Sequence, residues 1–191
     1  MNFDEKKDKI YPWIKVVYEP DEEVPNSTQE IKLKAEEQPI KQNWLGNLAI
    51  FYAVDEGEQF SIILKRDLPK NISIADLHEI ATTNLDRDVE FTYSETGFGG
   101  HGLIAGGDHE TGSLTLTGIW EWCADQIKDN LIVAFPAKDL VIMVPENEKE
   151  KINSLKNFVT EIFKNGERLL TKQLYRFDKS NNKWTVWGQA D

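Results

Sequence analysis

The chain has 191 residues, of which 40% are hydrophobic and 29% are charged. A chain of this length and composition can bury a large apolar core, which excludes global disorder and a small disulfide scaffold. The formal net charge is −11. Because a protein this acidic repels phosphate backbones, we expect no nucleic-acid partner.

Cysteine usage and the lengths of the apolar runs indicate a cytoplasmic protein. Cys123 is the single cysteine, so no intramolecular disulfide can form, as is usual in a reducing compartment. The N-terminal segment has no apolar stretch of signal-peptide length. The longest aliphatic runs, at 131–135 and 140–144, have five residues each and are too short to cross a bilayer. We therefore expect no membrane partner.

The first strands are predicted from residue type and turn chemistry. Residues 1–9 are mostly charged and are expected to be flexible. β-branched and aromatic residues predict a strand over 10–18, and Pro12 indicates either a sheet edge or the start of a strand. Two β-rich runs, 47–54 and 59–64, flank a short acidic turn that contains glycine, and they predict a hairpin.

Alternation and capping residues predict the next elements. Apolar residues alternate with charged ones around 31–35, which indicates a short, half-exposed strand. A helix is predicted to begin at Ser73, because Asp76 follows at the spacing of a capping box. Apolar residues then keep a 3.6-residue period through Leu85. A further strand is expected at 89–93.

The C-terminal half predicts one helix and two hairpins. The helix covers residues 118–128. Buried strands at 131–135 and 140–144 form the first hairpin. Strands at 173–177 and 184–187 flank an Asn-Asn turn and form the second.

A longer helix separates these two hairpins, and its ends complete the prediction of the fold class. Asn147 is expected to cap this helix, and Gly166 to end it. Hairpins separated by about three helices predict an α+β fold, with the helices packed on one face of a mostly antiparallel or mixed sheet. Regular βαβ alternation is absent, so a doubly wound fold is less favoured. We expect a single domain over residues 1–191.

Several short motifs are similar, in their order and spacing, to those of one family of bacterial proteins. NLAIFYAVD resembles the family's "dLxvxYvxD" strand, and LHEIATTNL resembles its "LHexAxxNL" helix. Three further motifs resemble the family's "yPvIk", "vAxPxxDxL" and "pLTxxLFxyxxxxW" elements. The residues that match these three are Tyr11, Pro12 and Ile14; Pro136, Asp139 and Leu140; and Leu170, Thr171, Leu174, Tyr175 and Trp184.

The family is catalogued as domain of unknown function 1444, and the chain resembles a short or divergent member. The similarity covers residues 10–93 and 131–187 and leaves 94–130 unmatched. The family has no established activity. The resemblance therefore implies an α+β fold and a bacterial cytoplasmic origin, and it supplies no catalytic residues.

Residues 94–116 break the periodic patterns and are expected to form a glycine-rich connection. Within them, 97–112 hold seven of the twelve glycines and two of the three histidines. Long glycine-rich connections inside a compact domain are usually either functional or disordered. Negative charge is concentrated here too, since residues 86–125 contain eight acids and one base.

Two ligand sites are conceivable in this segment. Gly97, Gly99 and Gly102 satisfy a G-x-G-x-x-G pattern, but a dinucleotide site needs a helix to begin there, and the nearby acids oppose phosphate. Two histidines and an acid could hold a divalent metal ion, because imidazole and carboxylate are zinc ligands. These candidate metal ligands are His101, Asp108 and His109. No spacing fixes two of them on one rigid face, so a solvated connection is the favoured interpretation.

The helix at 118–128 contains a cysteine between two tryptophans and several acids. Cys123 could act as a nucleophile, but Glu121 and Asp125 would raise its pKa, so we favour a buried, inert thiol. Trp120 and Trp122 point to different sides of a helix, so one of them is expected to be partly exposed. An exposed tryptophan near acids is typical of an interface anchor with a charged rim.

The leading hypothesis is a non-enzymatic protein that needs no cofactor and binds a basic protein partner through the acidic region 86–125. Electrostatic complementarity raises association rate and selectivity. By analogy, inhibitory or immunity-type proteins against basic toxins have this character. The predicted partner-binding residues are Asp108, Glu110, Trp120, Glu121 and Asp125. The alternatives are a metal-assisted, hydrolase-like enzyme that uses the histidine-containing loop, and a small-molecule sensor with a pocket under that loop.

Overall fold

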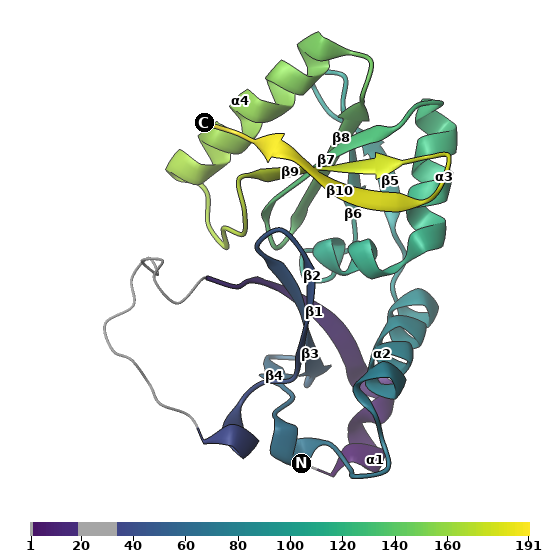
Figure 1. Cartoon of the computed structure of the whole chain (residues 1–191), viewed down its shortest axis with the longest axis vertical. Coiled ribbons are helices and arrows are strands. Elements are labelled where there is room, and N and C mark those ends of the chain that lie inside the picture. The colour runs from purple at the N-terminus through teal and green to yellow at the C-terminus, as the bar shows by residue number, and fades with distance from the viewer. Residues whose placement is uncertain (1, 19–33) are drawn as a thin grey trace. The chain divides into compact units, whose positions relative to one another are not determined.

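The computed structural model describes residues 2–18 and 34–191. Residues 1–88 and 89–191 form two compact units (Figure 1). Both units contain antiparallel, open sheets and helices, so the predicted α+β class is confirmed.

The first unit contains a four-stranded sheet organised around β3 (Leu48–Asp55). β1 (Ile10–Val16) pairs with one edge of β3 over the full length of β1. β2 (Lys41–Leu45) and β4 (Phe60–Ile62) pair with successive parts of the other edge. The predicted hairpin is confirmed, and so is the edge position of the strand that contains Pro12.

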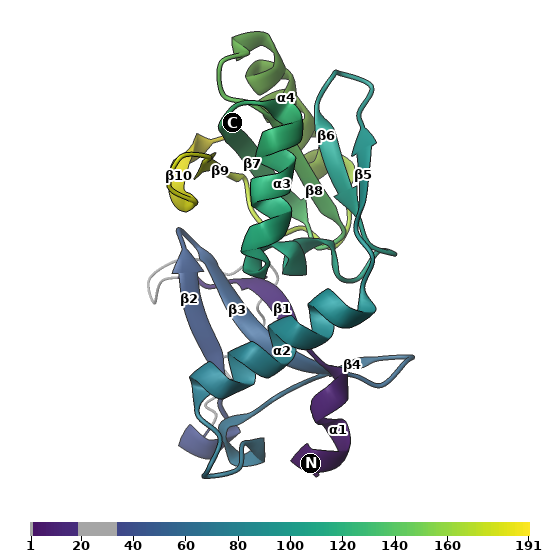
Figure 2. The same cartoon turned by 90° about the vertical axis from the view of Figure 1, so that its right-hand side faces the viewer.

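Helix α2 (Ile74–Asp88) packs against β1, and Figure 2 shows it lying across the sheet. The predicted capping box is present. The Ser73 hydroxyl accepts a hydrogen bond from the Asp76 N–H at 3.1 Å, and the Asp76 carboxylate accepts one from the Ser73 N–H at 2.8 Å. This reciprocal pair satisfies backbone donors that the first turn otherwise leaves free. The buried apolar residues of the helix are Leu77, Ala81 and Leu85.

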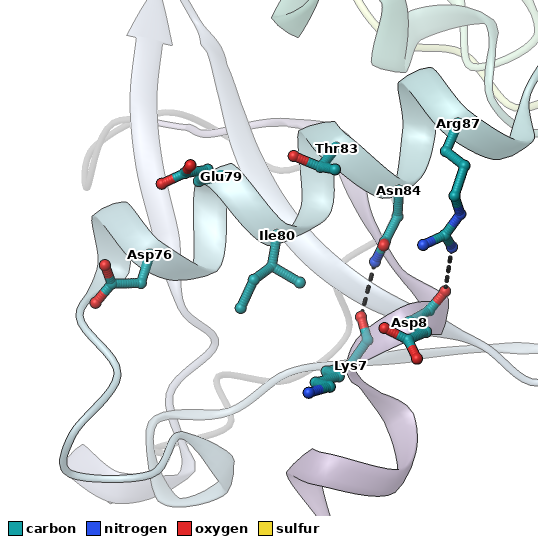
Figure 3. Close-up of a pocket in the computed structure, with 8 residues that line it drawn as sticks. All are labelled: Lys7, Asp8, Asp76, Glu79, Ile80, Thr83, Asn84 and Arg87. Atoms are coloured by element: carbon teal, nitrogen blue, oxygen red, sulfur yellow. Dashed lines mark hydrogen bonds between the residues drawn. The ribbon is translucent and has the colours of Figure 1, made fainter.

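Two polar segments of the first unit differ from the expectations. The chain forms two short helical turns, α1 (Phe3–Lys6) and η1 (Lys7–Lys9), where a frayed end was expected. Phe3 of α1 is buried, and Asn84 and Arg87 of α2 donate hydrogen bonds to the backbone of η1 (Figure 3). The strand expected around 31–35 lies mostly outside the described residues, and Ala35 begins a 3₁₀ helix, η2 (Ala35–Glu37). A second such helix, η3 (Lys65–Asp67), precedes α2.

The second unit contains a six-stranded antiparallel sheet in the order β10-β9-β7-β8-β6-β5. Both predicted C-terminal hairpins are confirmed, as β7–β8 and β9–β10. The strands are β5 (Thr92–Glu95), β6 (His101–Ile104), β7 (Leu131–Ala137), β8 (Leu140–Pro145), β9 (Gln173–Asp178) and β10 (Lys183–Gln189). The helices are η4 (Glu110–Thr115), α3 (Thr117–Ile127) and α4 (Lys149–Asn165).

Helices cover both faces of this sheet, not one. All seven residues of β7 are buried, so the strand needs cover above and below. Ile132 and Ala134 belong to an apolar cluster with α4, whereas the ring of Phe135 meets Trp120 of α3 at 6.0 Å. Alternate residues of a strand face opposite sides. The two helices therefore lie on opposite sides of the sheet, as Figure 1 shows.

The ends of α4 differ in how well the sequence predicts them. Glu148, not Asn147, is the N-cap residue, and no side chain caps the helix. Instead the Asn147 N–H donates to Asp129 at 2.9 Å. Gly166 ends the helix as predicted, and a Cβ there would lie 2.6 Å from the Ile162 carbonyl oxygen. This close approach, rather than a left-handed conformation, requires glycine.

Within the described residues, none of the helices has the length and apolar composition needed to span a bilayer.

Candidate functional site

The first half of the glycine-rich segment is a hairpin, not a structureless connection. β5 and β6 pair in register, and the Thr96 N–H donates to the Gly100 carbonyl at 2.8 Å across the turn. Gly99 has a φ of +79°, which favours glycine. Strand β6 follows this turn and no helix begins at the motif, so the G-x-G-x-x-G pattern lacks the helix N-terminus that a pyrophosphate needs.

The second half of the segment is folded around Glu110, which is only 2% exposed. Its Oε1 accepts hydrogen bonds from the backbone N–H groups of Ala105 at 2.9 Å and Gly107 at 2.6 Å. Gly106 and Gly107 both have positive φ, which allows the chain to turn back toward this carboxylate. Glu110 was predicted to bind a partner, but its burial removes it from any contact surface. Its observed role is to close the loop.

Asp108 lies on the same loop and is held by Arg168. The guanidinium donates to the Asp108 carboxylate at 2.7 Å and to the Gly107 carbonyl at 2.6 Å. A second acid, Asp139 in the β7–β8 turn, lies 3.8 Å from the same guanidinium. Asp108 is half-exposed, but it belongs to a local ion-pair network at this end of the sheet.

The three predicted metal ligands do not form a metal site. His101 lies in β6 with its ring stacked on Tyr93 at 4.8 Å, and Asp108 pairs with Arg168. His109 directly precedes η4. Across the residues that the structure describes, no three His, Cys, Asp or Glu side chains are grouped to hold a metal ion. His101 is held in strand β6, whereas Asp108 and His109 belong to the loop after that strand. The three side chains are therefore not brought together around one point.

Trp120 was predicted to anchor a partner, but it is a core residue. It is fully buried, and its indole N–H donates to the Ser113 carbonyl at 2.7 Å. Its ring packs edge-on against Trp184 at 4.8 Å. The expected exposed tryptophan is Trp122, which is 47% accessible to solvent.

Trp122 lies on the exposed face of α3, and the neighbours of that face come from opposite edges of the sheet, Tyr93 from β5 and Lys179 from the turn after β9. Its ring rests edge-on against Tyr93 at 5.2 Å with an interplanar angle of 86°. On the same helix, Glu121 accepts a hydrogen bond from the Asn182 amide, and Asp125 pairs with Lys179 at 2.9 Å. We call Tyr93, Glu121, Trp122 and Asp125 the Trp122 surface.

The predicted acidic residues do not form one patch. Asp108 lies near Asp139 in the β7–β8 turn. Asp125 pairs with Lys179, which directly follows β9. The end of β9 lies beside the start of β7, where Phe177 pairs with Leu131. This is the end of β7 that lies away from the β7–β8 turn. Asp108 and Asp125 are therefore at opposite ends of the central strands. Of the five predicted partner-binding residues, only Glu121 and Asp125 belong to the Trp122 surface.

Cys123 packs beneath this surface. The thiol is fully buried, and burial raises its pKa to about 12. At neutral pH the side chain is therefore a protonated thiol, which is a poor nucleophile. This environment agrees with the inert thiol expected from the sequence.

No family model matches the chain, and no curated protein or solved structure matches it either.

The role assigned to Glu110 predicts a difference between two neighbouring acids. Glu110→Ala leaves two partly buried amide donors without an acceptor and should lower the free energy of unfolding by about 1–3 kcal/mol. Asp108→Ala removes an exposed ion pair and should lower it by less than about 1 kcal/mol. Urea unfolding followed by tryptophan fluorescence measures both. Equal losses for the two variants would contradict the assignment.

The burial of Cys123 predicts slow thiol chemistry in the native protein. A disulfide reagent at pH 8 should label the native chain only through unfolding, because the thiol is buried and its pKa is raised to about 12. The unfolded chain, with an ordinary thiol pKa, should be labelled at once. A labelling rate in native buffer that matches the rate in denaturant would show that Cys123 is accessible.

Proposed function

We propose that the second unit is a protein-binding module that contacts a basic partner through the Trp122 surface. The observation that carries the proposal is a half-exposed tryptophan that packs on a tyrosine ring and shares the exposed face of α3 with two exposed acids. Partly exposed tryptophans are frequent anchors of interfaces, where one side chain fills a pocket on the partner.

The packing of Trp122 favours this role over chance exposure. Tyr93 supports the indole edge and is itself stacked on His101, so the anchor is held in place before a partner arrives. Binding then orders few additional side chains, which reduces its entropic penalty. The rest of the indole remains available for contact.

The two acids give the surface its selectivity. Asp125 has a side chain that is 68% exposed, and its ion pair with Lys179 is solvent-screened and weak. A carboxylate accepts several hydrogen bonds, so Asp125 and Glu121 can each bind a cationic group of a partner in addition to their present neighbours. Lysine or arginine side chains on the partner would satisfy both acids, and the net charge of −11 would steer such a partner toward the protein.

The enzymatic alternative has less support. His101 and Asp108 are held by different neighbours, a tyrosine ring and Arg168, so no constellation for metal-assisted hydrolysis is assembled from them. From the motifs quoted above, we further propose a relationship to the domain of unknown function 1444 family and a cytoplasmic location, neither of which assigns an activity.

The proposal predicts which variants lose a partner. We expect affinity capture from a lysate of the source organism with tagged wild-type protein to recover a basic protein. Recovery should fall about tenfold with Trp122→Ala, and similarly with the double reversal Glu121→Lys/Asp125→Lys. Higher salt should weaken binding of the wild type, since exposed charges are screened.

The matched control is the double reversal Glu161→Lys/Glu167→Lys, one residue in the last turns of α4 and one just after that helix, which changes the net charge equally. This control should retain the partner. Surface substitutions of this kind leave stability within about 0.5 kcal/mol, which thermal unfolding verifies. Equal loss of the partner with both double reversals would show that net charge alone controls the binding. Unchanged recovery of the partner with Trp122→Ala would refute the Trp122 surface as the binding site.

A further inference from the structure

The outer edge of β5 is free within the second unit, and it borders the Trp122 surface. β5 is the last strand in the order of the sheet (Figure 2). Among the strands that the structure describes, it pairs only with β6. An edge strand presents a row of backbone N–H and C=O groups with which another extended chain can pair. Such an edge is a template for strand addition.

The hydrogen bonds of the β5–β6 hairpin show which residues face the free edge. Bonded and non-bonded pairs alternate along an antiparallel ladder. The Thr96 N–H donates to the Gly100 carbonyl at 2.8 Å, so the next residue, Glu95, belongs to a non-bonded pair. By the same alternation the Ser94 pair is bonded and the Tyr93 pair is not. The backbone N–H and C=O groups of Tyr93 and Glu95 therefore point away from β6.

The side chains of these two residues lie on the α3 side of the sheet. The ring of Tyr93 meets that of Trp122 at 5.2 Å, and alternate residues of a strand share a face. Glu95 is therefore on the same face as Tyr93. Glu95 is exposed, and within residues 2–18 and 34–191 its carboxylate has neither a hydrogen bond nor an ion pair.

The charges around this edge favour a cationic partner. Lys151 of α4 reaches the β5–β6 turn, where a Cβ on Gly99 would lie 3.2 Å from its Cε. Its ammonium is paired with Glu148 at 2.9 Å. Burial lowers the pKa of His101, so this side chain is neutral at pH 7. The charge of Glu95 therefore remains available to a ligand.

A second copy of the chain is a poor occupant of this edge. It would bring another Glu95 to the interface, and both molecules would carry a net charge of −11. Charged side chains on an edge strand act against pairing of identical edges. A basic strand meets no such repulsion.

We propose that the basic partner adds a strand to β5, antiparallel to it, and that this strand packs against Trp122. The inference rests on the function proposed above and names its binding mode. The backbone of the added strand would exchange hydrogen bonds with Tyr93 and Glu95. Its residue opposite Glu95 would be lysine or arginine. Two positions on, its residue opposite Tyr93 would be apolar and would contact Trp122. The recognised feature is an extended basic-x-apolar triplet.

A blocked threonine peptide that contains the triplet Lys-Thr-Ile tests the inference on the full chain. Bound antiparallel, it places its lysine opposite Glu95 and its isoleucine opposite Tyr93. Amide hydrogen exchange resolved by NMR should slow about tenfold at the Tyr93 and Glu95 N–H groups when the peptide is present at about ten times its Kd. The reason is that each N–H then has a hydrogen-bond acceptor.

Two control peptides separate the contribution of the backbone from that of the charge. N-methylation of the lysine and isoleucine removes the N–H groups that face β5. Replacement of the lysine by glutamate reverses the charge that faces Glu95. Each control should bind at least about tenfold more weakly than the original peptide. The protein is unchanged in these measurements, so a variant that fails to fold cannot produce the result.

Two variants at one position make the same separation in the protein. Glu95→Gln removes the charge and keeps the N–H, whereas Glu95→Pro removes both. Proline is tolerated where the N–H of an edge strand faces solvent. Peptide affinity should fall with Glu95→Gln and fall about tenfold further with Glu95→Pro. The control Glu167→Gln removes an exposed acid of the same unit outside β5 and α3 and should leave the affinity unchanged.

The outcomes distinguish failure of this inference from failure of the proposed function. Strand addition is wrong if the peptide binds while the Tyr93 and Glu95 amides exchange as before, or if the glutamate peptide binds equally well. It is also wrong if no peptide binds in the millimolar range. The proposed function is decided separately, by capture of the partner from lysate with Trp122→Ala.

Discussion

The second unit depends on the burial of β7 on both of its faces. All seven residues of this strand are buried, and an apolar strand inside a sheet is stable only if a layer covers each side. Helix α4 covers one side through Ile152, Leu155 and Val159. The other side is covered by α3, whose buried residues are Trp120, Cys123 and Ala124.

This burial determines the chemistry of the exposed face of α3. Successive residues of a helix are rotated by about 100°, so residues two apart point to nearly opposite sides. With Trp120 packed against Phe135 and Trp184, Trp122 is turned outward together with Asp125. The proposed binding surface is thus the outer side of the same helix that closes the core, and any partner contacts a rigid element.

The sequence predicted local features well because local interactions create them. The Ser73–Asp76 capping box and the hairpins rest on residues that are close along the chain. Strand β2 was not predicted, because it lies in a polar segment and its residues alternate only weakly between exposed and half-buried. Its pairing with β3 makes it a strand. The glycine-rich segment was expected to be a connection because glycine carries no packing pattern. Its order comes from pairing with β8 and from the buried carboxylate of Glu110.

The candidate site was predicted only in part, for the same reason. Two tryptophans that are two residues apart on a helix allow two rotations of that helix, each of which buries a different tryptophan. Phe135 and Trp184, the rings that pack on Trp120, are distant from it in the sequence, so the sequence pattern of the helix does not show which rotation is adopted. Trp120 was therefore chosen as the anchor in place of Trp122. Likewise, acids that are close in sequence were expected to share a surface, but the sheet places Asp108 and Asp125 at opposite ends.

The most direct test of the central claim is oxidative footprinting of the native chain, with the two tryptophans of α3 resolved by fragment mass spectrometry. The outward orientation of Trp122 predicts that it is oxidised at least about tenfold faster than Trp120, which is fully buried. If Trp120 were oxidised as fast as Trp122, the assigned phase of α3 would be wrong and the proposed binding surface would not exist.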